Sequence, residues 1–333
     1  MNGKSCLKTV FLCLATMLVG CGQKDNAPTD EKAVVVTKNV WDGPEISLMC
    51  VGREGDDVDL FCRAVSKEMA ADLGVSIEVV TGDSYRLAVS ALSNRVALAP
   101  LLLLGVEDTF VMGEPAGEEG FAPTNFSFHV IAESPGVISV PSKSRHTKIQ
   151  GLVREAKREG SSVSISAGKS GGVWHAKMLG LGDAADVSFK FTPTFDDDGS
   201  VAAAYGGQSA AAVGSLASQA KYIIRGDMKP LGMLDGTGHT LADVGTIDPV
   251  SDLYPDLEND GVTPFVAIVV EKKQPEALRQ RIGEAFQTAV ESEGVKQLIK
   301  EKYWHRVGQW GAKTDQGIVA GAKRRIEYLE AGE

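Results

Sequence analysis

Buried strands that alternate with amphipathic helices constrain this chain more than any other feature. An apolar strand at Ile46–Val51 precedes a turn, and apolar residues then follow at helical spacing from Val58 to Met69. Gly74 ends that helix, and the alternation from Val75 to Val79 predicts a second strand. Strand, helix and strand in this order build parallel sheets with helices on their faces. The sequence therefore predicts an α/β fold.

The same pattern recurs further along the chain. The stretch from Val106 to Ser127 has little periodicity, and we expect loop and short strand there. The folded part has roughly three hundred residues, more than one core usually serves, so we expect two lobes. The other predicted elements are a helix from Ile149 closed by Gly160, strands at Ser162–Ser166, Ala210–Val213, Leu231–Leu234 and Val266–Val270, and helices from Val173, over Leu216–Arg225 and after Pro275.

The first twenty residues have the pattern of a secretory signal. Lys4 and Lys8 precede an apolar run from Val10 to Leu18, which is too short to cross a membrane as a helix. The run ends in Leu-Val-Gly-Cys, which resembles the lipobox of bacterial lipoproteins, where the cysteine is acylated with chains such as palmitate. We expect Cys21 to be the lipidated N-terminus of the mature chain. The alternative is an ordinary signal peptide with a chance cysteine.

The segment that follows Cys21 is polar. Gly22–Lys38 carries too little apolar surface to fold by itself and predicts a flexible tether, with the folded part beginning near Val40. The formal charge of the chain is -10, and removal of a signal that holds two lysines and no acids makes it more negative still. Nucleic acid is therefore not an expected partner. We expect a monomer on the outer side of a bacterial membrane, periplasmic or at the cell surface.

Two cysteines remain in the folded part. Cys50 ends a predicted strand, and Cys62 lies in the second turn of the next helix. Outside the cytoplasm such a pair can form a disulfide, and the alternative is two small buried side chains.

One motif has the form of a nucleophile elbow. Gly168–Gly172 fits G-x-S-x-G between a strand and a helix, which makes a periplasmic serine hydrolase that uses Ser170 an alternative function. No histidine followed by glycines lies upstream to form an oxyanion hole. A serine-directed reagent separates the two functions, because labelling lost in Ser170→Ala would favour the enzyme. The downstream acids and histidines for a triad would be Asp227 or Asp235 with His239 or His305.

Nucleotide and metal sites are not predicted. The Gly-Lys-Ser triplet at Gly168 lacks the upstream glycine of a phosphate-binding loop, since Val163 occupies that position. The five histidines are not spaced as ligand pairs on a helix, and no Cys-x-x-Cys occurs. We expect no metal, no cofactor and no catalytic residue.

Two glycine-containing turns are the candidate ligand sites. Gly52–Asp57 and Ser166–Gly172 each follow a strand and precede a helix, whose first N–H groups suit an anion. Glycine lets the backbone come close to a ligand.

Several segments together resemble a known family. The run from Ser200 through Gly206 and Gly207 to Leu231, the Val140–Ser142 segment, the Ser166–Gly168 turn and the stretch from Pro275 to Trp304 are similar to the substrate-binding receptors of tripartite tricarboxylate transporters. The likeness extends from about Ile46 to Trp304.

The resemblance implies a two-lobed venus-flytrap fold in which each lobe is a mostly parallel sheet flanked by helices. It implies a small organic ligand, mostly a carboxylate, that is closed between the lobes and delivered to a multi-span membrane permease. A receptor for a different transporter, or a sensor, is the remaining alternative. The implied divisions are residues 1–20 as signal, 21–39 as tether, 40–137 and 238–333 as one lobe, and 138–237 as the other.

The resemblance also implies ligand-binding residues, with Phe195 where the family often has tyrosine and Ser215 where a polar residue follows the strand. At the first turn the chain departs from the family, which has alanines and glycines there. Glu54, Asp56 and Asp57 in this chain would repel a carboxylate. Either Asp56 and Asp57 cap the helix while Arg53 meets the anion, or the ligand also carries a positive group. The full set is Gly52, Arg53, Glu54, Gly55, Asp56, Ser166, Ala167, Gly168, Lys169, Ser170, Gly171, Gly172, Phe195 and Ser215.

We predict that Arg53→Ala and Gly171→Asp each weaken ligand binding without unfolding the protein, because the two residues lie in the two facing turns. Calorimetric titration of the purified variants measures this. Unchanged affinity in both variants would contradict the assignment.

Overall fold

A computed structural model describes residues 45–82, 101–111, 122–159, 163–257 and 261–332. The predicted signal, Cys21 and the tether lie outside these residues, as does the helix stop at Gly160. None of the helices in the described ranges has the length and apolar character needed to cross a membrane.

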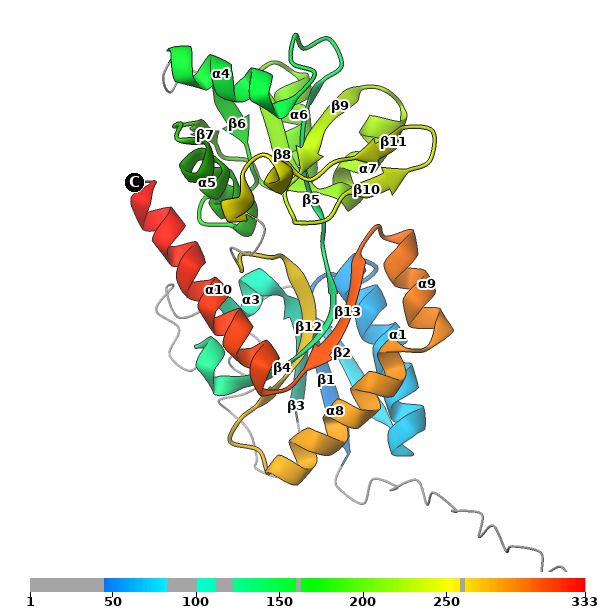
Figure 1. The fold of residues 1–333 in the computed structure, drawn as a ribbon. Helices are drawn as coiled ribbons and strands as arrows, with labels where there is room; N and C mark the ends of the chain where they lie inside the picture. The colour runs from blue at the N-terminus through cyan, green and yellow to red at the C-terminus, as the bar shows by residue number, and fades with distance from the viewer. Residues whose placement is uncertain (1–44, 83–100, 112–121, 160–162, 258–260, 333) are drawn as a thin grey trace, which may run out of the picture. The chain divides into compact units, whose positions relative to one another are not determined.

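The described residues form two main β-sheets with helices on their faces, drawn in Figure 1. The first sheet has the order β13-β4-β12-β3-β1-β2 and the second β7-β6-β8-β5-β9. The first consists of β1 (Ile46–Val51), β2 (Ile77–Gly82), β3 (Leu101–Val106), β4 (Phe126–Glu133), β12 (Phe265–Glu271) and β13 (His305–Trp310). The second consists of β5 (Gly136–Pro141), β6 (Ser164–Ser166), β7 (Lys190–Thr192), β8 (Ala211–Ser215) and β9 (Met228–Met233), and β10 (His239–Leu241) pairs with β11 (Gly245–Ile247) as a hairpin.

The first strand, helix and strand follow their sequence signals closely. β1 pairs in parallel with β2, with Ile46 opposite Ile77. Between them α1 (Asp57–Leu73) begins after Asp56, whose carboxylate accepts from the N–H of Asp59, and ends at Gly74 in the left-handed conformation. The predicted α/β class is confirmed.

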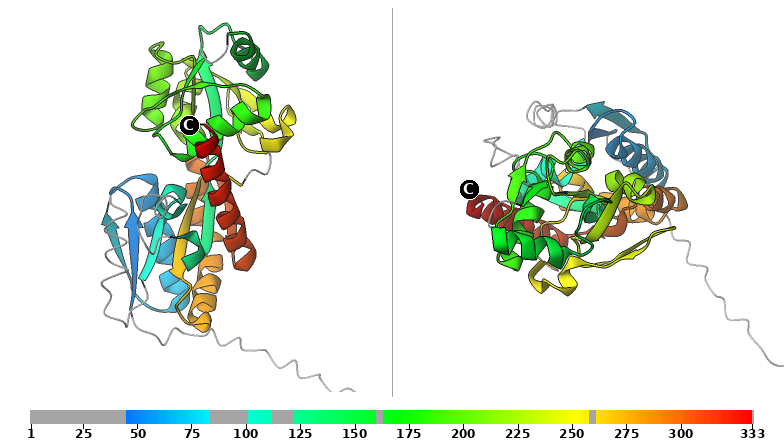
Figure 2. Two further views of the ribbon diagram at one scale, coloured as in Figure 1. Left: turned by 90° about the vertical axis from the view of Figure 1, so that its left-hand side faces the viewer. Right: turned by 90° about the horizontal axis from the view of Figure 1, so that it is seen from above.

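Each core consists of two clusters, one on either face of its sheet. In the first sheet, α1, α8 (Glu276–Val290) and α9 (Glu293–Glu301) cover a cluster that includes Leu48 and Phe286, and the opposite face packs Phe110, Phe128 and Phe265. The second sheet is covered by α4 (Ile149–Glu159) and α5 (Val173–Ala185) on one face, and by α6 (Asp197–Tyr205) and α7 (Leu216–Ile224) on the other. Figure 2 shows these layers from two further directions.

The strand pairing is mixed, so the expectation of mostly parallel sheets was wrong in this detail. β12 runs antiparallel to both β3 and β4, and β5 runs antiparallel to both β8 and β9. The reason is the way the chain crosses between the sheets. β4 leads almost directly into β5, with only Ser134 and Pro135 between them, and the chain returns to the first sheet at Phe265.

Residues beyond the predicted boundary at 238 still pack against the second sheet. Leu241, Val250 and Val262 pack into its cores, so the return to the first sheet comes after Val262 rather than at residue 238. The C-terminal helix α10 (Ala312–Ala331) contacts β4 of the first sheet and α5 of the second (Figure 1). Its Tyr328 is buried in the second core.

The stretch from Val106 to Ser127 contains more regular structure than predicted. A short helix α3 (Glu107–Val111) follows β3, a 3₁₀ turn spans Pro123–Asn125, and β4 begins at Phe126. Residues 112–121 lie outside the described ranges. β4 is buried along both faces, although its sequence alternates between apolar and polar residues from Phe126 to Val130.

A disulfide joins Cys50 at the end of β1 to Cys62 in α1, with their Cα atoms 6.2 Å apart. Both side chains are fully buried, and Phe61 beside them packs edge-on against Trp304. The bond closes a loop that contains the whole first ligand turn.

We predict that replacing both cysteines with alanine lowers the free energy of unfolding by about 2 to 3 kcal/mol. The disulfide closes a short loop that restricts the unfolded chain, and without it the unfolded chain gains conformational entropy. Urea titration of wild type and variant, each with and without reductant, measures the effect. Reductant should destabilise only the wild type; equal sensitivity of the two proteins would contradict the prediction.

Candidate functional site

A cavity of about 450 Å³ lies where loops of both sheets meet. The first sheet contributes the turn after β1 and the start of α3, and the second contributes the glycine turn after β6 and the loop before α6. Its apolar walls include Trp174, Phe195, Phe265 and Trp304. The cavity has the size of a small-molecule site, and elements far apart in sequence build it.

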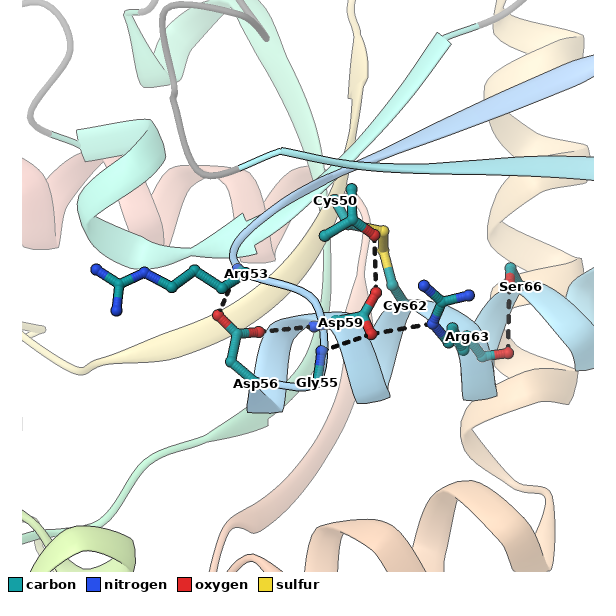
Figure 3. A network of polar contacts seen from close by, with 9 residues as sticks. Cys50, Arg53, Gly55, Asp56, Asp59, Cys62, Arg63 and Ser66 are labelled. Carbon is teal, nitrogen blue, oxygen red and sulfur yellow. Dashed lines mark hydrogen bonds and ion pairs between the residues drawn. A yellow bond between two sulfur atoms is a disulfide. The ribbon is translucent and has the colours of Figure 1, made fainter.

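The first turn is held by its own carboxylates, as Figure 3 shows. Asp56 accepts from the N–H of Arg53 at 2.7 Å and from that of Asp59 at 2.9 Å. The carboxylate of Asp59 accepts from the N–H of Gly55 at 3.0 Å and from Thr81 Oγ1 at 2.7 Å. These acids therefore take up N–H groups that could otherwise hold an anionic ligand.

Asp59 is a structural charge. It is 2% exposed, and the hydrogen bond from Arg63 Nε lowers the pKa of its carboxyl to about 2 against the opposing effect of burial. The group thus stays ionised at neutral pH and fixes the turn after β1 to β2. The guanidinium of Arg53 has no such partner among the described hydrogen bonds and lines the cavity.

Hydrogen bonds to buried groups hold the second turn, Ser166–Gly172, in place. Ser166 is fully buried, and its Oγ donates to the Ser200 carbonyl at 2.7 Å. The N–H of Gly168 donates to Ser200 Oγ at 2.8 Å, and that of Gly171 donates to His175 Nδ1 at 3.2 Å. Both of these glycines have positive φ, 65° and 75°, which explains the glycine content of the turn.

The N-terminus of α5 differs from its neighbours because no side chain caps it. Gly172 occupies the cap position without a side-chain hydrogen bond, and Gly172, Val173 and Trp174 line the cavity. Lys169 also lines it, with its ammonium 5.3 Å from the ring centroid of Phe195. N–H groups at a helix start that no side chain of the described residues caps, together with a nearby ammonium, make this corner suited to an anion.

At the N-terminus of α7 the chain supplies its own anion. Asp197 Oδ2 accepts from both the N–H and the hydroxyl of Ser215, at 2.8 and 2.6 Å. Burial raises the pKa of Asp197, and the hydrogen bonds from Ser215 oppose the shift. The polar groups of Ser215 therefore face a carboxylate of the protein at the edge of the cavity.

A buried ion cluster joins the two sides of the site. Arg325 of α10 is 1% exposed, pairs with Glu107 and with Asp108, and donates to the carbonyl of Gly171 at 2.6 Å. Glu107 and Asp108 begin α3 on the first sheet, whereas Gly171 lies in the glycine turn of the second. Burial raises the pKa of Glu107 to about 8, although the charge of Arg325 opposes this.

The predicted ligand residues divide into two groups. Those that line the cavity are Arg53, Asp56, Ala167, Gly168, Lys169, Gly172, Phe195 and Ser215. Gly52, Glu54, Gly55, Ser166, Ser170 and Gly171 are not among its lining residues, although Ser166 and Gly171 support the glycine turn through hydrogen bonds. The positive φ of Gly171 means that aspartate there strains the backbone whatever its effect on a ligand.

Sequence reasoning missed several residues of the cavity. Glu107 and Asp108 directly follow a buried strand, and Asp196 and Asp197 stand at the start of a helix. Acidic residues where a strand leads into a helix could therefore have indicated these four as candidates for the cavity lining. Trp304 gave no such signal, because its place depends on long-range packing. The other missed lining residues are Val106, Ser134, Val173, Trp174, Pro264 and Phe265.

The geometry gives the hydrolase alternative no support. Ser170 is exposed, and none of the hydrogen bonds in the described part of the chain joins it to a histidine. The nearby His175 uses Nδ1 to accept from Gly171, and its ring stacks on Phe191 with centroids 3.7 Å apart. Within the described ranges, no group of three metal-binding side chains is placed to hold an ion.

Comparison with known proteins gives a consistent result. Residues 124–320 match the model of a family described as tripartite tricarboxylate transporter family receptor. No match is found among curated proteins.

Solved structures share the fold at low sequence identity. A TctC solute-binding protein from Polaromonas, solved without ligand, is 16% identical with a TM-score of 0.68, over 86% of this chain and 96% of that one. An R. palustris protein with adipate is 15% identical with a TM-score of 0.63, over 88% and 98%. MatC from Rhodopseudomonas palustris with bound malate is 15% identical with a TM-score of 0.58, over 87% and 97%. The two-lobed fold class is thereby confirmed.

We predict that Arg325→Ala lowers the free energy of unfolding by about 3 to 5 kcal/mol, because it leaves Glu107 buried without its partner. Lys323→Ala on the same helix is the control, since the Lys323 side chain is 80% exposed, and its effect should stay within about 0.5 kcal/mol. Urea unfolding of both variants gives the comparison. A loss below about 1 kcal/mol for Arg325→Ala would show that the cluster is not structural.

Proposed function

The chain belongs to the receptor family of tripartite tricarboxylate transporters, and from this we propose that it is an extracytoplasmic solute-binding lipoprotein that captures a small organic acid and delivers it to a multi-span permease. The observation that supports this most is the cavity itself, because both sheets contribute charged and aromatic side chains to it. A ligand held this way contacts both lobes at once. Its affinity then depends on their closure around it.

We assign the anionic end of the ligand to the uncapped N-terminus of α5. There the first N–H groups of the helix, the ammonium of Lys169 and the guanidinium of Arg53 are available to a carboxylate. Adipate in one structural relative and malate in another are carboxylates, which agrees with an anion at this position.

The proposal includes a lipid anchor at Cys21. The seventeen residues of Gly22–Lys38 would then form a flexible tether with a reach of roughly 20 to 25 Å. Such a tether keeps a monomeric receptor close to the membrane that holds its permease.

We predict that Gly172→Asp weakens binding of the native ligand at least a hundred-fold while the protein still folds. Gly172 has φ -68° and ψ 165°, a conformation open to aspartate, and the new carboxylate would cap α5 in place of the ligand. Gly172→Ala is the matched control, because it adds the same Cβ, 3.0 Å from the Lys169 carbonyl, without the charge.

Thermal-shift screening of organic acids and amino acids first identifies a ligand, and calorimetry then measures its affinity for each variant. We expect at least a hundred-fold loss for Gly172→Asp, or about 2.7 kcal/mol, and a much smaller loss for Gly172→Ala. Equal losses in the two variants would contradict an anion at α5.

A further inference from the structure

The N–H groups best placed to receive an anion are mostly occupied by carboxylates of the chain. Asp56 caps α1, Asp196 caps α6, and Ser215 at the start of α7 donates to Asp197. Each carboxylate takes the position that an acidic ligand would use. Of α1, α5, α6 and α7, only α5 has no side-chain cap among the described residues.

The charges around the cavity are unbalanced. Within the described part of the chain, its lining contains five carboxylates, and the only lining cations are Arg53 and Lys169. Arg325 adds a third positive charge from behind, paired with two of the acids. Burial raises the pKa of Glu107 to about 8, so this acid carries little charge at neutral pH, but the other four acids still outnumber the three cations. The five are Asp56, Glu107, Asp108, Asp196 and Asp197.

One of these acids has a spare oxygen. Glu107 is 5% exposed and gives one carboxylate oxygen to Arg325, while its Oε2 has no hydrogen-bond partner among the residues that the structure describes. A buried carboxylate oxygen without a donor is costly, and burial accordingly raises the pKa of Glu107. A second cation beside it would stabilise the ionised form.

The aromatic walls also suit a cation. Trp304, Trp174 and Phe195 line the cavity, and an ammonium packs favourably against such rings. Phe195 is 68% exposed and already lies near the ammonium of Lys169, so the site combines acids with ring faces.

We propose that the ligand is zwitterionic, with a carboxylate held at α5 and an ammonium or guanidinium group facing Glu107, Asp108 and Asp197. This inference rests on the proposed function and specifies the class of solute. The acids and aromatic rings of the cavity thus favour an amino acid or another amino-substituted organic acid over a simple dicarboxylate.

A matched ligand series tests the proposal. Adipate, 6-aminohexanoate and 1,6-diaminohexane each have six carbons and carry two, one and no carboxylates, with an aminomethyl group in place of each carboxylate that is lost. Malate and aspartate differ by hydroxyl against ammonium. Calorimetry of the wild-type protein with these probes, together with a thermal-shift screen of amino acids, amines and organic acids, ranks the classes. We expect the tightest ligand to carry both charges and to bind at least ten-fold better than its ammonium-free counterpart.

The outcomes separate this inference from the function on which it rests. Tighter binding of an ammonium-free acid would overturn the zwitterion while leaving the solute receptor standing. Binding of no compound in the screen would count against both. Tightest binding of the diamine would overturn the assignment of a carboxylate to α5.

Two isosteric variants localise the effect. Asp197→Asn keeps an oxygen for Ser215 and removes the charge, and Asp108→Asn changes a side chain that is 45% exposed. Each should weaken the zwitterion by at least ten-fold and leave an ammonium-free acid unchanged or tighter. Asp198→Asn is the control, because Asp198 is the next residue of α6, pairs with Lys221 and does not line the cavity.

If Asp197→Asn and Asp108→Asn both fold with wild-type melting temperatures and keep full affinity for the zwitterion, the acidic side of the cavity is not its cation site. A similar loss in Asp198→Asn would mean that the effect is one of overall charge, which would also contradict the proposal.

Discussion

The ion pairs and the hydrogen bond of the Arg325 guanidinium hold together the parts of the site that come from the two sheets. This guanidinium lies buried where α10, α3 and the glycine turn meet, and it joins carboxylates of the first sheet to a backbone carbonyl of the second. A buried ion pair adds little net stability compared with apolar packing, but the loss of one partner is costly. Arg325 therefore contributes more to the relative position of the turn after β6 and the start of α3, both of which it contacts, than to net stability.

Most of the helix N-termini at the cavity are already capped by side chains of the protein. A receptor for anions can leave these termini open for its ligand, whereas this chain fills most of them with aspartates and leaves α5 open. The same aspartates that stabilise their helices also set the potential of the cavity. Helix capping and the charge of the cavity thus have a common cause here, since Asp56 and Asp196 are both capping and lining residues.

Much of the fold could be predicted from the sequence, because apolar periodicity and glycine stops are local signals. β1, α1 and α8 lie almost where their patterns indicate. α3 was missed because five residues are too few for a helical period, whereas the alternation of Phe126, Ser127 and Phe128 was an available signal for β4. At the site, Lys169 and Gly172 come from a recognisable turn, but Trp304 and Arg325 reach it only through tertiary packing. Sequence spacing cannot reveal such residues.

The short connection between β4 and β5 has a mechanical consequence. Ser134 donates its N–H to the carbonyl of Pro264 at 2.8 Å, so the outgoing and returning chains are joined side by side, and both residues line the cavity. The two crossing segments are thereby tied to each other where they line the cavity, and α10, which contacts both β4 and α5, makes a further connection between the sheets. A change in the angle between the sheets would therefore have to displace Tyr328 from the second core as well as bend these two segments.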